Sequence, residues 1–258
     1  MDLSRTLRSQ RDLMHHEIIA DEYETVVNQP RDIANTALFR RVSNFLPHNK
    51  KAMLDIGCGS GQMTQRFGNY FESVTAVDHS QGMLCAARKK LSQRPALFKR
   101  IHFIEDDAFN YASSVSKKFD FICAVGFLHH LAPGDLEEML RLLSALLTRE
   151  GSILLAEPLE FDPAEEPKLA RWWNQPFRKG SLGYSKVAEE PDEAPIPLAC
   201  LLNALHKAGL QVTYSRRGWE LLPRFGGGVL DKAIIPMLDV FTRKNGVVGL
   251  FVASRRPR

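Results

Sequence analysis

The sequence holds little that would suggest a disulfide framework, a metal site or a membrane segment. Its four cysteines include no C-x-x-C pair and lie at positions 58, 85, 123 and 200, so neither zinc nor a redox dithiol is indicated. No apolar run approaches the roughly 20 residues that a membrane-spanning helix needs, and the polar residues 1–10 contain no apolar signal core. We therefore expect a cytoplasmic protein with reduced thiols, no membrane span and no resident metal.

Strong charge of either sign is also missing. The formal net charge is +4 over 258 residues, and part of the excess comes from the arginines among the last four residues. A nucleic-acid surface usually shows a basic stripe interleaved with aromatic residues, and the chain has no such stripe. The composition is that of an ordinary globular protein, long enough for one large α/β domain or two small ones. We expect no nucleic-acid partner.

What the chain does contain is a glycine-rich stretch at residues 54–61, with the sequence LDIGCGSG. The apolar run at 52–56 predicts a buried strand, and Met63, Phe67 and Tyr70 recur beyond it at helical spacing. The unit is therefore a strand, a glycine-rich turn and a helix. Open α/β folds bind ligands at this position, at the carboxyl end of a sheet strand.

The glycine spacing separates two kinds of ligand. A dinucleotide fingerprint reads G-x-G-x-x-G, whereas here Gly57, Gly59 and Gly61 are followed by Gln62. Asp55, two positions before the first glycine, would repel a diphosphate but would suit a cationic amino-acid ligand. The stretch resembles motif I of the class I S-adenosylmethionine (SAM)-dependent methyltransferases, which reads acidic-x-G-x-G-x-G. SAM is the cofactor that the resemblance implies.

Alternating strand and helix patterns follow along the chain. Further strands are predicted at 74–78, 101–109, 119–125, 151–158, 210–215 and 247–253, and helices at 80–91, 135–147 and 198–208. The third strand is expected to run through a turn into the fourth. Such alternation indicates a mostly parallel sheet with helices on both faces. The resemblance implies a Rossmann-like, seven-stranded α/β fold whose last strand is antiparallel, and we treat residues 1–258 as a single domain.

Acidic residues close the second and third predicted strands. Asp78 lies about twenty residues after the glycine turn, where a carboxylate can accept hydrogen bonds from both ribose hydroxyls. In the family a second carboxylate accepts from the adenine amino group; Asp107 matches it best, with Asp106 as the alternative. Met83 either packs on the adenine or is simply core. The resemblance thus implies a cofactor-binding set of Asp55, Gly57, Cys58, Gly59, Gly61, Asp78, His79, Met83, Asp106, Asp107, Ala108, Phe109, Val125 and Gly126.

The run Gly126-Phe127-Leu128-His129-His130-Leu131 follows the fourth predicted strand. It resembles the L-H-H-L stretch of small-molecule methyltransferases. An acceptor with an acidic proton needs a base, and histidine titrates near neutral pH. His130 and His129 are therefore the candidate catalytic residues, with His130 the better match. In the family this histidine more often holds the loop in place.

Three segments extend beyond the minimal fold, and each can cover the site. Residues 1–35 are expected to form a helical cover, where Tyr23 matches an A-x-x-Y segment of ubiquinone-type methyltransferases. Residues 159–197 are an insertion, interpreted as an active-site cover or a purely structural addition. Residues 226–243 are predicted to be an extra helix that packs on the core, with closure of a lipophilic pocket or contact with a partner as the alternatives. Substrate contacts are expected from Tyr23, Phe127, Trp172 and Trp173. The adjacent His15 and His16 point about 100° apart on a helix and are expected to be solvated.

The resulting prediction is a SAM-dependent methyltransferase, monomeric or homodimeric, acting on an O, N or C atom of a small aromatic or lipophilic molecule. The loop after the fourth strand is not the N-P-P-[FY] loop of nucleic-acid amino methyltransferases. Two alternatives stay open: a methyltransferase acting on RNA or protein, and a SAM-binding module without catalysis. A nicotinamide dehydrogenase is disfavoured by the glycine spacing.

Overall fold

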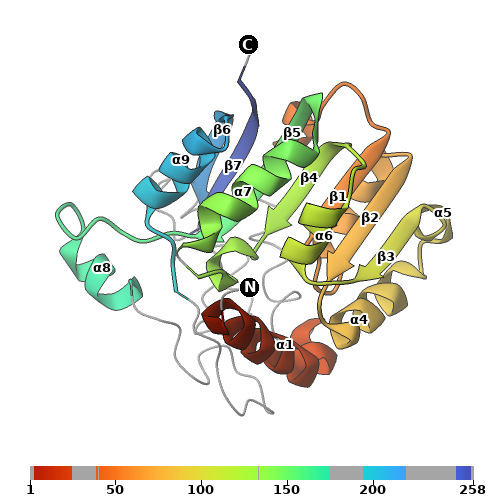
Figure 1. Ribbon diagram of the computed structural model, residues 1–258, viewed down its shortest axis with the longest axis horizontal. Helices are drawn as coiled ribbons and strands as arrows, with labels where there is room; N and C mark the ends of the chain where they lie inside the picture. The colour runs from red at the N-terminus through yellow and green to blue at the C-terminus, as the bar shows by residue number, and fades with distance from the viewer. Residues whose placement is uncertain are drawn as a thin grey trace, which may run out of the picture.

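The fold is a seven-stranded sheet with helices on both faces, as the sequence predicts (Figure 1). The computed structural model describes residues 3–24, 39, 41–132, 134–174, 194–218 and 248–256. The strand order is β3-β2-β1-β4-β5-β7-β6. The strands are β1 (Ala52–Ile56), β2 (Ser73–Asp78), β3 (Ile101–Glu105), β4 (Phe119–Val125), β5 (Leu147–Pro158), β6 (Leu210–Gly218) and β7 (Val248–Arg255).

The centre of the sheet is parallel and buried on both faces. Strand β1 pairs in parallel with both β2 and β4, with Leu54 opposite Thr75 on one side and Ile122 on the other. All five residues of β1 are buried, and this explains why its sequence is an apolar run rather than an alternation. The carboxyl ends of β1, β2 and β4 therefore meet at one edge of the sheet.

One strand runs against the others. Strand β7 lies between β5 and β6 and is antiparallel to both, which confirms the predicted antiparallel last strand. Strand β5 begins four residues earlier than predicted, with a register irregularity opposite β4 between Phe119 and Phe121. Strand β6 extends three residues beyond the predicted end because β7 pairs with it as far as Gly218.

The described helices are α1 (Leu3–Tyr23), α3 (Gln62–Phe67), α4 (Gln81–Leu91), α5 (Pro95–Phe98), α6 (Ala108–Ser114), α7 (Asp135–Leu146), α8 (Pro167–Trp173) and α9 (Leu198–Lys207), with short 3₁₀ turns η2 (Val42–Phe45), η3 (Gly68–Tyr70) and η4 (Leu128–His130). Helix α6 replaces the turn that we expected between the third and fourth strands. Asp107 starts it, because its Oδ1 accepts hydrogen bonds from the backbone N–H groups of Phe109 and Asn110. The extra helix predicted at 226–243 lies outside the described residues.

The two faces of the sheet carry separate cores. Helices α6, α7 and α9 cover one face (Figure 1), where Leu140 and Leu143 pack against the sheet. Helices α3 and α4 pack on the other face, around a cluster of phenylalanines. There the ring of Phe121 stacks on Phe71 at 5.6 Å between centroids and meets Phe67 edge-on at 5.8 Å.

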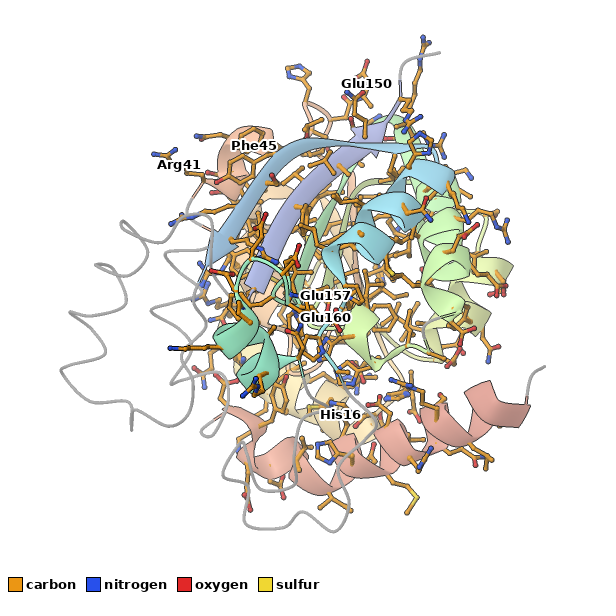
Figure 2. All side chains as sticks on the ribbon, turned by 90° about the vertical axis from the view of Figure 1, so that its left-hand side faces the viewer. His16, Arg41, Phe45, Glu150, Glu157 and Glu160 are labelled. Carbon is orange, nitrogen blue, oxygen red and sulfur yellow. The ribbon has the colours of Figure 1, made fainter. Side chains whose placement is uncertain are left out.

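Helix α1 runs across the end of the sheet rather than along a face (Figures 1 and 2). It packs on α4, where Ile19 and Ala20 of α1 enclose Met83. Ile19 faces the core and is 1% exposed, whereas Ile18 faces outward and is 38% exposed. Within the described residues, no helix is long and apolar enough to cross a membrane.

Phe121 tests the aromatic core. We expect Phe121→Ala to lower the free energy of unfolding by about 3–5 kcal/mol, because the lost ring leaves a cavity between Phe71 and Phe67. Tyr70→Ala, which removes a ring that is 46% exposed, should cost less than about 1 kcal/mol. Urea unfolding of both variants measures the difference, and similar losses would contradict the packing described.

Candidate functional site

A pocket opens at the carboxyl end of the sheet, and the glycine turn forms one of its walls. Gly57 and Gly59 have φ values of +64° and +51°, which side chains rarely adopt. A Cβ at Gly57 would lie 2.6 Å from Cδ2 of Phe127, whereas a Cβ at Gly59 or Gly126 would have nothing within 4 Å. The turn therefore packs tightly against Phe127 at Gly57, whereas at Gly59 there is space beside the backbone for a ligand.

Asp55 is a buried carboxylate at the base of this turn. Its Oδ2 accepts hydrogen bonds from the backbone N–H of Thr64 at 2.8 Å and from the hydroxyl of Thr64 at 2.6 Å. Burial raises the pKa of Asp55 to about 7, since the hydrogen bonds from Thr64 offset only part of the desolvation. Asp55 also lines the pocket, so a cationic group of a ligand there would favour its ionised form.

Asp78 connects the glycine turn to helix α4. Its Oδ2 accepts from the backbone N–H of Gly59 at 2.7 Å, and its Oδ1 accepts from that of Ser80 at 2.9 Å. Ser80 in turn caps α4 by accepting from the backbone N–H of Met83. Each carboxylate oxygen of Asp78 can accept a second hydrogen bond, and the residue lines the pocket.

Asp106 and Asp107 lie side by side at the pocket but have different surroundings. One oxygen of Asp107 caps α6, and the other accepts from the hydroxyl of Ser9 at 3.2 Å. The backbone N–H of Asp106 donates to the carbonyl of Asp78. Among the described residues, none donates a hydrogen bond to the Asp106 carboxylate.

The loop after β4 is held by Glu157, whose side chain is completely buried. The Glu157 carboxylate accepts from the backbone N–H groups of Phe127 and Leu128 at 3.1 and 2.9 Å, and it lies 2.8 Å from Nδ1 of His129. His129 therefore anchors the loop and does not line the pocket. His130 lines the pocket and comes within 2.8 Å of Asp12 on α1.

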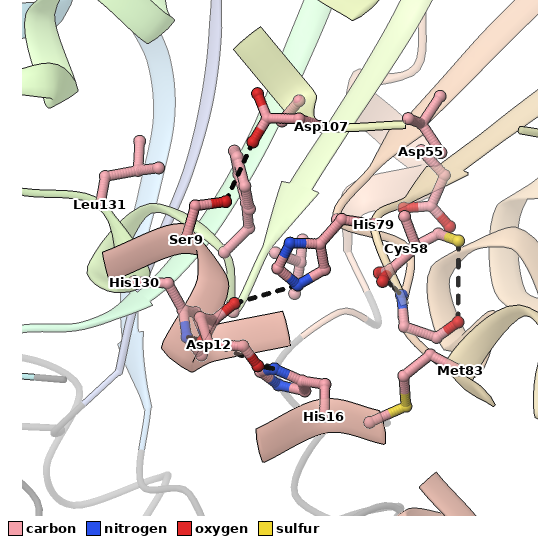
Figure 3. Close-up of a pocket in the computed structure, with 18 of the residues that line it drawn as sticks. Ser9, Asp12, His16, Asp55, Cys58, His79, Met83, Asp107, His130 and Leu131 are labelled. Carbon is pink, nitrogen blue, oxygen red and sulfur yellow. Dashed lines mark hydrogen bonds and ion pairs between the residues drawn. The ribbon is translucent and has the colours of Figure 1, made fainter. Parts of the chain in front are cut away.

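Asp12 is a site residue that the sequence analysis missed. Its carboxylate lies 2.8 Å from Nδ1 of His130, 3.1 Å from Nε2 of His79 and 3.4 Å from Nδ1 of His16 (Figure 3). Burial alone would raise the pKa of Asp12, but the imidazoles of His130 and His16 hold it well below its usual range.

The expectation that His15 and His16 are solvated is wrong. His15 is buried, and His16 lines the pocket beside Asp12. Burial alone would lower the pKa of His16, yet the carboxylate of Asp12 raises it above its ordinary value. The signal in the sequence was the spacing of Ser9, Asp12 and His16, which puts three polar side chains on one face of a helix.

Comparison with known proteins agrees with this geometry. Residues 53–151 match the family model of a methyltransferase domain. The chain is 28% identical over 125 residues to a probable S-adenosylmethionine-dependent methyltransferase, CRG1, of Saccharomyces cerevisiae, covering 48% of this chain and 42% of that protein. It is 31% identical over 106 residues to the mitochondrial ubiquinone biosynthesis O-methyltransferase of Schizosaccharomyces pombe, covering 41% and 37%.

Solved structures share the whole fold at low identity. The complex of DhpI with SAM and HEP has a TM-score of 0.67 at 13% identity, and covers 100% of both chains. A SAM-dependent methyltransferase from Clostridium acetobutylicum has a TM-score of 0.61 at 16% identity, and covers 93% of this chain and 98% of its own. Residues 53–151 thus match a methyltransferase domain, and the fold is that of SAM-dependent methyltransferases.

The methyltransferase fold brings most of the predicted site residues into one pocket. Those that line it are Tyr23, Asp55, Gly57, Cys58, Gly59, Asp78, His79, Met83, Asp106, Asp107, Ala108, Phe109, Val125, Gly126, Phe127 and His130. Gly61 and His129 do not line the pocket. Trp172 and Trp173 are in α8, and their side chains lie outside the described part of the structure. The additional lining residues from α1 are Arg8, Ser9, Asp12 and His16.

The pKa of Asp55 gives a pH-dependent prediction for the ligand-free protein. Between pH 4 and 7 the folded protein holds the Asp55 proton more tightly than the unfolded chain, so ionisation costs stability as the pH rises through this range. Asp55→Asn removes this cost. We expect the stability of the variant relative to wild type to increase by about 2–4 kcal/mol from pH 4 to pH 8, measured by urea unfolding. A constant difference would show that the carboxyl ionises as it does in the unfolded chain.

Proposed function

We propose that this chain transfers a methyl group from SAM to an O, N or C atom of a small acceptor molecule. The observation that supports this most strongly is the convergence of the glycine turn with the carboxylates of Asp55, Asp78 and Asp106–Asp107 at one pocket. Figure 3 shows Asp55 and Asp107 among the residues that line it. These groups are complementary to a ligand that has a cationic amino acid at one end and a nucleoside at the other.

The surroundings of each group fit a different part of SAM. The space beside Gly59 and Gly126 admits the ligand close to the backbone. Asp55 would pair with the ammonium group, and the remaining lone pairs of Asp78 would accept from the ribose hydroxyls. Within the described residues the Asp106 carboxylate accepts no hydrogen bond and would be available for the adenine amino group, whereas Asp107 already caps α6.

SAM supplies a methyl group on a sulfonium, which departs as a neutral thioether. The chain therefore has to align donor and acceptor and to exclude water. Helix α1 covers the pocket, with the hydroxyl of Ser9 reaching Asp107 and Arg8 Nε donating to the carbonyl of His130 at 2.8 Å. The buried carboxylate of Glu157 fixes the backbone of the loop that carries Phe127.

His130 is the better candidate for a general base. Its ring lines the pocket, and its Nδ1 is held by the carboxylate of Asp12. A carboxylate in that position orients the imidazole and stabilises its protonated form. His129 has a different role, because its ring is held by Glu157 behind the loop.

The acceptor is proposed to be a small aromatic or lipophilic molecule. Apolar side chains of Phe109, Phe127 and Leu131 line the pocket beside the polar groups, a combination typical of small-molecule sites. The relative in Schizosaccharomyces pombe named for ubiquinone biosynthesis supports the same class of acceptor. The pocket mouth is crossed by α1, and this favours a small molecule over RNA or a protein.

Donor binding tests the site itself. We expect Asp78→Asn to weaken the binding of S-adenosylhomocysteine at least tenfold in calorimetry, because Asp78 both holds the turn and faces the pocket. Asp162→Asn is the matched control, since Asp162 also accepts a backbone N–H, from Ala164, but in an exposed turn. Tight binding of NADH in place of S-adenosylhomocysteine would contradict the proposed donor.

Acceptor screening tests the rest of the proposal. Labelled SAM is supplied with a panel of phenols, quinone precursors and aromatic amines, and separately with RNA and protein. We expect S-adenosylhomocysteine to form with members of the small-molecule panel. Methylation of RNA or protein alone would refute the small-molecule proposal, and donor binding without turnover on any acceptor would identify a non-catalytic module.

A further inference from the structure

A compact group of metal-ligating side chains lies on the α1 side of the pocket, where two residues of α1 meet His79 of the expected cofactor-binding set. It consists of Asp12, His16 and His79, each offering one ligand atom, and these three atoms all lie within 4.8 Å of one another. Figure 3 shows the three side chains converging from α1 and from the segment after β2. We propose that they form a binding site for a divalent transition-metal ion.

The spacing along the chain supports this proposal. Asp12 and His16 are four residues apart on α1, so their side chains share one face of the helix. His79 comes from the turn that follows β2, directly after Asp78. Two ligands from one helical turn and a third from a distant segment form an arrangement that metal sites in proteins often use.

The distances are close to those that an ion requires. Ligand atoms of a tetrahedral ion with bonds of about 2.0–2.2 Å lie about 3.3 Å apart. Oδ2 of Asp12 and Nε2 of His79 are already 3.1 Å apart. Nδ1 of His16 is 3.4 Å from the other carboxylate oxygen, Oδ1, and 2.9 Å from the main-chain carbonyl oxygen of Asp12. All three ligand atoms lie within 4.8 Å of one another, so the side chains would have to rotate to complete the set.

The donor atoms select the kind of ion. Two imidazoles and one carboxylate suit Zn²⁺, Fe²⁺, Co²⁺ or Ni²⁺, whereas Mg²⁺ and Ca²⁺ prefer oxygen ligands alone. Three protein ligands leave at least one coordination position for water or another molecule. All three residues line the pocket in which we place the donor, so under the proposed function that position would be open to an oxygen atom of the acceptor.

A second layer of contacts orients the carboxylate. Oδ1 of Asp12 lies 2.8 Å from Nδ1 of His130, and this leaves Oδ2 directed at His79. The side chain of Arg8 on α1 also donates a hydrogen bond to the backbone carbonyl of His130. Such outer contacts fix the ligands of metal sites in proteins. The cluster also explains why α1 buries a carboxylate, which is costly without a partner of opposite charge.

Metal titration of the full chain tests the site. The parent protein for this test carries Cys85→Ser and Cys200→Ser, which remove the two exposed thiols. It is treated with a chelator and dialysed. Binding of Zn²⁺ alone is then measured by calorimetry, and binding of Co²⁺ by visible absorption. We expect one ion per chain and a Co²⁺ spectrum without thiolate bands. We also expect Zn²⁺ to raise the Tm, because an ion that binds only the folded chain stabilises it.

The variants decide which side chains hold the ion. His79→Gln and His16→Gln should each weaken Zn²⁺ binding at least tenfold and abolish the Tm increase, whereas His48→Gln, at an exposed position, should change neither. Because each glutamine can still donate a hydrogen bond to Asp12, the metal-free variants should keep a Tm near that of the parent. Unchanged Zn²⁺ affinity in both pocket variants, or no binding by the parent at about 100 µM Zn²⁺, overturns the proposal.

Donor binding is measured in parallel on the metal-free parent. If S-adenosylhomocysteine binds while Zn²⁺ does not, the metal site is refuted and the proposed function stands. If Zn²⁺ binds through His16 and His79 while S-adenosylhomocysteine does not, the metal site stands and the proposed donor is refuted.

Discussion

The carboxylate of Asp78 joins the elements on which the pocket depends. One of its oxygens holds the glycine turn at Gly59, and the other holds the first residue before α4. A single side chain at the end of β2 thus fixes the loop that follows β1 and the start of the helix that follows β2. The parallel pairing of these strands makes this possible, because it places their carboxyl ends side by side.

A second carboxylate plays a similar part on the other side of the pocket. Glu157 is fully buried at the end of β5 and accepts hydrogen bonds from the loop that follows β4. These hydrogen bonds hold Phe127 against the glycine turn, where its ring occupies the space that a side chain at position 57 would need. The two loops therefore pack directly against each other, and both line the pocket.

Helix α1 completes the pocket and lines one side of it with polar side chains. Its inner face contributes Ser9, Asp12 and His16, each within hydrogen-bonding or ion-pairing distance of a residue of the sheet edge or of α1 itself. In this wall the imidazoles of His16, His79 and His130 surround the carboxylate of Asp12. It connects the cover of the site to the loop that carries His130.

The sequence alone determined the sheet, the glycine turn and the strand-end carboxylates, because burial on both faces imposes continuous apolar runs and because strand ends are read from local patterns. It did not determine α6, whose start depends on the capping geometry of Asp107. It favoured His130 over His129 by resemblance alone, and only the folded loop shows that Glu157 holds His129 while Asp12 holds His130. The Asp12 cluster depends on contacts between residues more than sixty positions apart, and only tertiary packing of α1 across the sheet brings such residues together.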